Sequence, residues 1–320
     1  MRQHHELKNI SVSKLSTLHQ GAFYVFISAA GFSIKAIFAK KAYEVGADPV
    51  TLLFLRLLFA APLFMLLAYW NATHNSVEKK ISKAEILSLM GLGILGYYLS
   101  SLMDFVGLFY ISASLERIIL FSYPTIVVIL TALFFRSSLD RKDYLALLIT
   151  YFGIFIVFSE ELKQTVLIPM ETLVTGCTLV FGSACTYALY LIGSGFIIPR
   201  IGAARFTAYS MLIATATMML HYFIAKGVVF PSFDNPIIWY GLAMAVFSTF
   251  MPAYFLAKGI KLIGSEKSSV ISTIGPVSTI VLANIVLGET MTWIQVCGTL
   301  IVIAGVLIIS LKTKKETTTR

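Results

Sequence analysis

The sequence predicts an all-α integral membrane protein with ten transmembrane helices, arranged as two inverted repeats of five helices. Composition is the first observation behind this prediction. Hydrophobic residues make up 58% of the 320 residues and charged residues only 13%, whereas soluble proteins carry about 25% charged residues. Apolar stretches of about 20 residues are the second observation, and they lack the alternation of barrel strands. Helices satisfy the backbone within each such stretch.

The predicted helices follow one another with short polar connections. They lie at 21–42, 50–70, 86–108, 113–135, 142–158, 172–192, 205–225, 237–257, 268–287 and 293–311. The first stretch is long enough to span a membrane and contains Lys35, so we expect a retained span and not a cleaved signal peptide. Residues 1–20 form a polar N-terminal segment, and residues 312–320 form a basic tail.

An internal duplication is the third observation. Residues 105–158 resemble residues 257–310 at a constant offset of 152. Identical residues that recur at this offset include Gly107 and Gly259, Ile111 and Ile263, Pro124 and Pro276, and Gly153 and Gly305. Duplicated hydrophobic units are typical of transporters that bind cargo between two halves. We expect the halves at 21–158 and 172–311, separated by a connection that begins with the acidic stretch Ser159–Gln164.

The distribution of Lys and Arg predicts the orientation. If the N-terminus lies inside, the inner segments hold 18 of these residues and the outer segments hold 5. Both termini are therefore predicted to be cytoplasmic, in a bacterial inner membrane. Because five is an odd number, the second half enters the membrane in the opposite direction, which suits alternating access. The net charge of +9 is explained by these loop cations, so no nucleic-acid partner is expected.

The sequence offers little to support an enzyme. The three cysteines lie in apolar stretches without a CxxC or Cys/His cluster, and no GxxxxGK[ST] phosphate loop occurs. We expect no catalytic residue, no metal and no cofactor. A lipid-modifying membrane enzyme is the rival class, but His221 is the only histidine inside a predicted span and no HxxxD or DxxD stands near it. A channel or a scaffold is a further rival, and the inverted repeat disfavours the scaffold.

Several motifs resemble a known family. The segment DPVTLLFLRLLFA (Asp48–Ala60) contains a P-x-T-x-x-x-x-R pattern, formed by Pro49, Thr51 and Arg56. YISASLERIILFSYP (Tyr110–Pro124) and IGPVSTIVLANIVLGETMTWIQVCGTLIVIAGV (Ile274–Val306) fit the later spans of each half. In order and spacing, these motifs resemble the EamA-like family of the drug/metabolite transporter superfamily over nearly the whole chain.

The resemblance implies a secondary transporter. Cargo in this superfamily includes amino acids, nucleotide precursors, sugars, phosphorylated metabolites and toxic compounds, and export of an amino acid or related metabolite is the expectation here. One departure is visible. The first half has Arg136–Ser138 (RSS) where the second has Gly288–Thr290 (GET), so the acidic residue Glu289 has no counterpart.

Charged residues within the predicted spans are candidates for function, because a charge at the centre of a membrane helix costs about 2.5–3.5 kcal/mol. Arg56 or Lys35 is predicted to bind an anionic or zwitterionic cargo, since a guanidinium matches carboxylate and phosphate oxygens. The alternative is structural: Arg56 pairs with Asp104, and Lys35 extends toward the interface. Glu116 and Arg117 are expected at the same level of the membrane.

Aromatic and hydroxyl residues form a second group of candidates. The predicted cargo-lining residues are Tyr97, Tyr98, Ser101, Tyr187 and Tyr190. The alternative for each is aromatic packing or an interfacial belt.

Other residues are assigned structural or gating roles. Pro124 and Pro276 predict matched bends in mid-helix. Glu289 is expected to cap the last span, with a role in coupling as the alternative. His221 is expected to lie at an interface, with a proton relay as the alternative. The glycines, including Gly153 and Gly305, predict close helix packing within the chain or in a homodimer. The expected partners are thus a small-molecule cargo and membrane lipid, with a coupled proton and a homodimer left open.

Overall fold

The computed structural model describes residues 2–74, 81–135, 141–164, 169–232, 234–272 and 274–316, and every regular element in these ranges is a helix. The segment Arg136–Ser138, the loop cations Lys79 and Lys80, and the end of the basic tail lie outside the described residues.

Each half contains several helical segments. The first half consists of α1 (Arg2–Glu44), α2 (Pro49–His74), α3 (Lys83–Gly93), the π-helical turn η1 (Ile94–Leu99), α4 (Ser100–Tyr110), α5 (Ala113–Leu120), α6 (Tyr123–Phe135) and α7 (Arg141–Gln164). The second half consists of α8 (Met170–Ile201), α9 (Ala203–Lys226), α10 (Pro236–Ala245), the π-helical turn η2 (Val246–Phe250), α11 (Met251–Ser272), α12 (Ile274–Leu282), the π-helical turn η3 (Ala283–Leu287) and α13 (Trp293–Glu316).

Within the described ranges, ten apolar helical segments account for the predicted spans. Eight of them are at least 18 residues long and apolar enough to cross a membrane, and two shorter ones cover Ile274–Leu287 and Trp293–Ile308. A membrane core of about 30 Å needs about 20 helical residues. The predicted all-α membrane fold class is confirmed.

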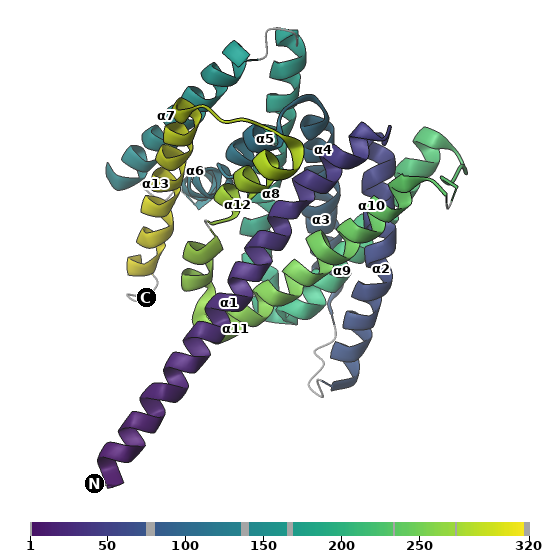
Figure 1. Ribbon diagram of the computed structural model, residues 1–320. Helices are drawn as coiled ribbons and strands as arrows, with labels where there is room; N and C mark the ends of the chain where they lie inside the picture. Colours follow the sequence, from purple (N-terminus) through teal and green to yellow (C-terminus); the bar gives the residue numbers. More distant parts are fainter. Residues whose placement is uncertain are drawn as a thin grey trace.

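Several helices extend beyond their predicted ends. The acidic stretch Ser159–Gln164 is the last part of α7, where Glu160 forms an ion pair with Lys163 one turn away at 2.9 Å. Such i,i+3 pairs stabilise a helix end. Helix α11 continues to Ser272, through a basic segment predicted as a loop. Helix α1 begins at Arg2, and its first turns extend away from the other helices (Figure 1).

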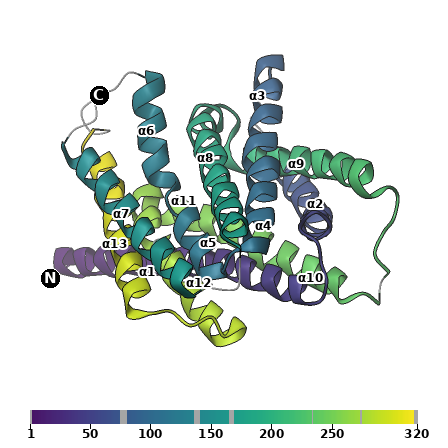
Figure 2. The ribbon, with the colours of Figure 1, turned by 90° about the horizontal axis from the view of Figure 1, so that it is seen from above.

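The two halves interlock. Helix α1 packs along α11 of the second half, and α8 packs along α4 of the first half (Figures 1 and 2). Helix α2 packs against its counterpart α9, and α7 against its counterpart α13. A two-fold relation between duplicated halves produces reciprocal contacts of this kind. The π-helical turns support the duplication, because Ile94 and Val246, where they begin, are separated by the same 152 residues as the sequence repeat.

The matched prolines start helices. Helix α5 ends at Leu120 and α6 begins at Tyr123, so Pro124 lies in the first turn of α6. Pro276 likewise lies in the first turn of α12, which begins at Ile274. Helices α5 and α6 belong to one span, Ala113–Phe134, whose helix is interrupted at Phe121 and Ser122 directly before Pro124. The residue before α12 lies outside the described residues, so the matched bend at Pro276 stays a prediction. A first-turn N–H has no partner within the helix, so proline is tolerated there without loss of a hydrogen bond.

Helix α2 lies at the centre of the largest apolar core. It contacts α9, α10 and α4, and Leu52, Leu53, Phe54, Leu55 and Leu57 are buried in succession around its whole circumference. The ring of Phe54 stacks on Tyr222 of α9, with centroids 4.0 Å apart. This packing fixes the rotation of α2 and hence the direction of Arg56.

Close packing of α7 on α13 leads to a first prediction. A Cβ atom added at Gly153 would lie 2.7 Å from Val302 Cγ2 and 2.8 Å from the Gly298 carbonyl oxygen. The backbone cannot yield as a flexible side chain can, so we expect Gly153→Ala to destabilise the protein by about 1–3 kcal/mol. Thermal unfolding in detergent measures the effect. Gly91→Ala is the control, because nothing lies within 4 Å of an added Cβ there. Equal stability of both variants would contradict the prediction.

Candidate functional site

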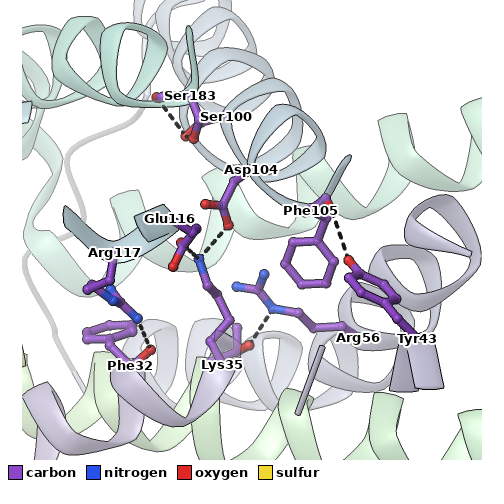
Figure 3. Close-up of polar contacts among 11 residues, drawn as sticks. Phe32, Lys35, Tyr43, Arg56, Ser100, Asp104, Phe105, Glu116, Arg117 and Ser183 are labelled. Atoms are coloured by element: carbon purple, nitrogen blue, oxygen red, sulfur yellow. Dashed lines mark hydrogen bonds and ion pairs between the residues drawn. The ribbon is translucent and has the colours of Figure 1, made fainter. Parts of the chain in front are cut away.

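A buried ion cluster joins three helices of the first half. Lys35 of α1, Asp104 of α4 and Glu116 of α5 are only 9%, 3% and 0% exposed. The Lys35 ammonium forms an ion pair with Asp104 Oδ2 and a second one, at 3.1 Å, with Glu116 Oε1 (Figure 3). Pairing of this kind offsets the cost of burying charged groups. Lys35 therefore does not extend to the membrane interface, as one alternative had it.

Local structure places these carboxylates. The π-helical turn η1 precedes α4 and rotates Asp104 relative to the start of the span. The Ser112 side chain caps α5 by accepting a hydrogen bond from Leu115 N at 3.1 Å. Glu116 lies in the first turn of α5, where the helix dipole favours a negative charge.

Arg56 lies beside this cluster and contacts neutral groups. Its side chain is 7% exposed, and its Nε donates a hydrogen bond to Thr249 Oγ1 of η2 at 2.8 Å. The guanidinium carbon lies 5.3 Å from the centroid of the Phe105 ring, within range of a cation–π interaction. Figure 3 shows its terminal nitrogens pointing toward the Lys35 ion pairs. The structural alternative paired Arg56 with Asp104, but Lys35 holds this carboxylate.

Two polar contacts in this region were not predicted. Thr249 belongs to the second half, so its hydrogen bond with Arg56 joins the halves. Ser100, the neighbour of the predicted and half-buried Ser101, contacts α8, with its Oγ 3.0 Å from Ser183 Oγ. Thr249 is the repeat counterpart of Tyr97, and this correspondence was the sequence signal that could have identified it.

The predicted tyrosines divide into two groups. Tyr97 of η1 meets Tyr190 of α8, whose hydroxyl donates to the Tyr97 hydroxyl at 2.9 Å. Tyr187 stacks on Tyr190 with ring centroids 5.7 Å apart, and Phe206 also stacks on Tyr190, with ring centroids 5.8 Å apart. These rings form one aromatic cluster.

Tyr98 lies apart from this aromatic cluster. Its hydroxyl is 3.0 Å from Nδ1 of His221 on α9. His221 therefore has a tyrosine partner from the first half of the chain.

Glu289 caps a helix of the other half. Its carboxylate accepts hydrogen bonds from Ala113 N at 2.8 Å, Ser114 N at 3.1 Å and Ser114 Oγ at 2.7 Å, all at the start of α5. The prediction that Glu289 caps the last span is wrong. Gly288 adopts φ +70°, which turns the chain, and Gln295 forms a capping pair with Thr292 at the start of α13.

Asp48 stabilises the start of α2, the helix that carries Arg56. Its carboxylate accepts hydrogen bonds from Thr51 N at 3.1 Å and Thr51 Oγ1 at 2.6 Å, and Lys226 Nζ lies 3.4 Å away. Partial burial opposes ionisation, but these contacts outweigh it and hold the pKa of Asp48 below its usual value. The resulting stabilisation is present at neutral pH and is lost as the pH falls through this lowered pKa. Asp48, Pro49 and Thr51 thus start α2 and position Arg56.

Comparisons with known proteins agree with this architecture. The sequence pattern of the EamA-like transporter family matches residues 19–159 and 174–311. The uncharacterized transporter YcbK of Bacillus subtilis (strain 168) is 36% identical over 95% of this chain and 98% of its own length. The uncharacterized inner membrane transporter YicL of Salmonella typhimurium is 24% identical over 82% of this chain and 85% of its own length.

A solved crystal structure shares the fold. It superposes with a TM-score of 0.62 at 13% sequence identity, over 92% of this chain and 98% of the other. The family pattern covers both halves, and the resemblance seen in the sequence is confirmed. The chain is therefore a member of the EamA-like transporter family, an integral membrane transporter and not an enzyme.

Proposed function

We propose that this transporter moves a small anionic or zwitterionic metabolite, such as an amino acid, by alternating access, and that it acts as an exporter in a bacterial inner membrane. The position of Arg56 carries the proposal. This arginine belongs to the first half and bonds to Thr249 of the second half, so a cargo bound to it would lie where the halves meet.

The charges at the site favour Arg56 over Lys35 as the cargo ligand. The Lys35 ammonium is already shared by Asp104 and Glu116. Arg56, by contrast, contacts a hydroxyl and an aromatic ring, which leave its positive charge uncompensated by a direct ion pair among the described residues. A guanidinium presents planar donors that bind a carboxylate through two parallel hydrogen bonds. A carboxylate on the cargo would supply the missing counter-charge.

The interlocked halves support alternating access. Inverted repeats exchange conformations around a fixed central site in many transporters. Here the helices that carry Arg56 and Lys35 both pack against helices of the second half, α2 on α9 and α1 on α11. The excess of Lys and Arg in the inner segments supports cytoplasmic termini. Export is an expectation from the family alone.

Exchange in proteoliposomes tests the proposal. Purified protein is given labelled amino acids, nucleosides, sugars and phosphorylated metabolites, each with an unlabelled pool inside. We expect saturable exchange of a carboxylate-bearing class. Arg56→Gln should lower exchange by about 10- to 100-fold, because a hydrogen bond to a charged group contributes about 1.5–3 kcal/mol. Arg56→Lys should retain part of the activity, since it keeps the charge without the planar donors.

An arginine outside the site provides the control. Arg200→Gln removes the same charge from an exposed position on α8 and should leave exchange unchanged. Undiminished exchange by a folded Arg56→Gln protein would refute Arg56 as the cargo ligand. Exchange restricted to neutral sugars or nucleosides would refute the cargo class.

A further inference from the structure

Two buried carboxylates share a single ammonium group in this protein. Asp104 and Glu116 come from different helices, and each places one oxygen on Lys35 Nζ. Their other oxygens, Asp104 Oδ1 and Glu116 Oε2, are buried and have no hydrogen-bond partner among the described residues. A buried acceptor without a donor is destabilising, and more so when it is charged. The arrangement is therefore incomplete without a further hydrogen-bond donor.

One proton bound to this pair of carboxylates would supply the missing hydrogen-bond donor. Two carboxylates at one site disfavour each other's ionisation, so one of them takes up a proton more readily than an isolated acid. The protonated group becomes a donor, and the trio then has one ammonium and one carboxylate, with no net charge. For the trio taken alone, this neutral state is the least costly one inside a membrane, and Arg56 beside it keeps its own positive charge for an anionic cargo.

The groups around the pair come from several helices. They are Lys35 and Tyr43 from α1, Arg56 from α2, Arg117 from α5, and the Ser100 and Ser183 contact between α4 and α8. Arg117 Nη2 is bound to the Phe32 carbonyl oxygen at 2.7 Å, and Glu289 binds the start of α5. Helix α12, which packs on α5, has no ionisable side chain. Lys35 is thus the cation that both carboxylates contact directly.

We propose that Asp104 and Glu116 bind one transported proton, so that a proton gradient drives the movement of cargo across the membrane. The proton is taken up by one carboxylate from water on one side and is released to water on the other side. Protonation weakens the hold of that carboxylate on Lys35, and this links the proton to the α1–α4 contact. Because α1 and α4 pack on α11 and α8, movement between the halves changes this contact. The inference rests on the proposed carrier function.

Infrared spectroscopy tests proton binding without any cargo. We expect the purified protein to show the carbonyl band of a buried protonated carboxyl group that disappears as the pH rises. Asp104→Asn and Glu116→Gln should each remove this titrating band. Glu160→Gln is the matched control, because Glu160 is also largely buried and ion-paired but lies at the end of α7. A titrating band that both variants keep, or its absence from the wild-type protein, would overturn the inference.

Transport tests the coupling. Vesicles are given a pH gradient with the acidic side inside in one experiment and outside in the other. One of the two gradients should drive accumulation of the cargo identified by exchange, and collapse of that gradient should abolish the accumulation. Asp104→Asn and Glu116→Gln should lose this accumulation in vesicles that still exchange cargo, whereas the control Glu160→Gln should keep it. Proton coupling would be refuted if both variants still accumulated cargo, or if wild-type vesicles exchanged cargo but did not accumulate it. Either result would leave the carrier function standing. Absence of wild-type exchange would instead refute the carrier function.

Discussion

Replacing Lys35 with methionine is expected to destabilise the protein by about 3–5 kcal/mol, more than any other substitution considered, because it leaves buried carboxylates without their cation. Lys35 is the direct ion-pair partner of both Asp104 and Glu116, which are 3% and 0% exposed. Methionine keeps the length and apolar character of the side chain, so the loss is specific to the charge. Thermal unfolding in detergent, followed by size-exclusion chromatography, measures the effect.

Neutralising the partners should restore stability. In the triple variant Lys35→Met, Asp104→Asn, Glu116→Gln, no uncompensated charge is left at these three positions, and we expect recovery of most of the loss. Lys163→Met provides the control, because Lys163 is 70% exposed and pairs with Glu160 one turn away. Such a pair contributes at most about 1 kcal/mol. A Lys35→Met protein as stable as the wild type would show that the carboxylates do not depend on this ammonium.

The sequence was sufficient to predict the duplicated architecture but not the partners within the site. Glycines and prolines at one offset, together with hydropathy, predicted ten helical segments, because these features depend on the chain alone. Lys35, Arg56 and Asp104 stood out for the same reason, as charges in apolar stretches. Which of them meet depends on the rotation of each helix. The π-helical turn η1 changes that rotation between Tyr97 and Asp104, so helical periodicity could not place both residues.

Glu289 shows a second limit of sequence reasoning. Capping rules relate residues a few positions apart, and they favoured the neighbouring last span. The actual partners, Ala113 and Ser114, are 176 and 175 residues away in the sequence. Only the fold brings the turn after η3 onto the start of α5. The same limit applies to Thr249, which no local pattern connects with Arg56.

Replacing Glu289 with glutamine is expected to shift the protein toward a conformation that is open at this end. The carboxylate accepts two backbone hydrogen bonds and one hydroxyl hydrogen bond across the halves. Loss of a helix cap costs about 0.5–2 kcal/mol. If the halves separate here during transport, the open population rises by about 5- to 30-fold for a loss of about 1–2 kcal/mol. The repeat counterpart of Glu289 is Ser137, so the sequence offers no second acid for this role.

Cysteine accessibility measures this shift. In a background with Cys177, Cys185 and Cys297 replaced by serine, Ala113→Cys introduces a thiol at a position that is fully buried beneath Glu289. We expect a membrane-impermeant maleimide to label this thiol faster when Glu289→Gln is also present. Glu171→Gln is the control, because Glu171 lies in the first turn of α8 at an exposed position.

Labelling and stability together separate two roles of Glu289. A carboxylate that only caps α5 contributes to stability in every conformation, so its loss lowers the unfolding temperature and leaves the labelling rate unchanged. A carboxylate that holds the halves together is bound only in the closed conformation, so its loss raises the labelling rate even where the protein stays folded. The three hydrogen bonds cross from the second half to the first, and this favours the second result. An unchanged labelling rate would show that Glu289 only caps α5 and does not hold the halves together.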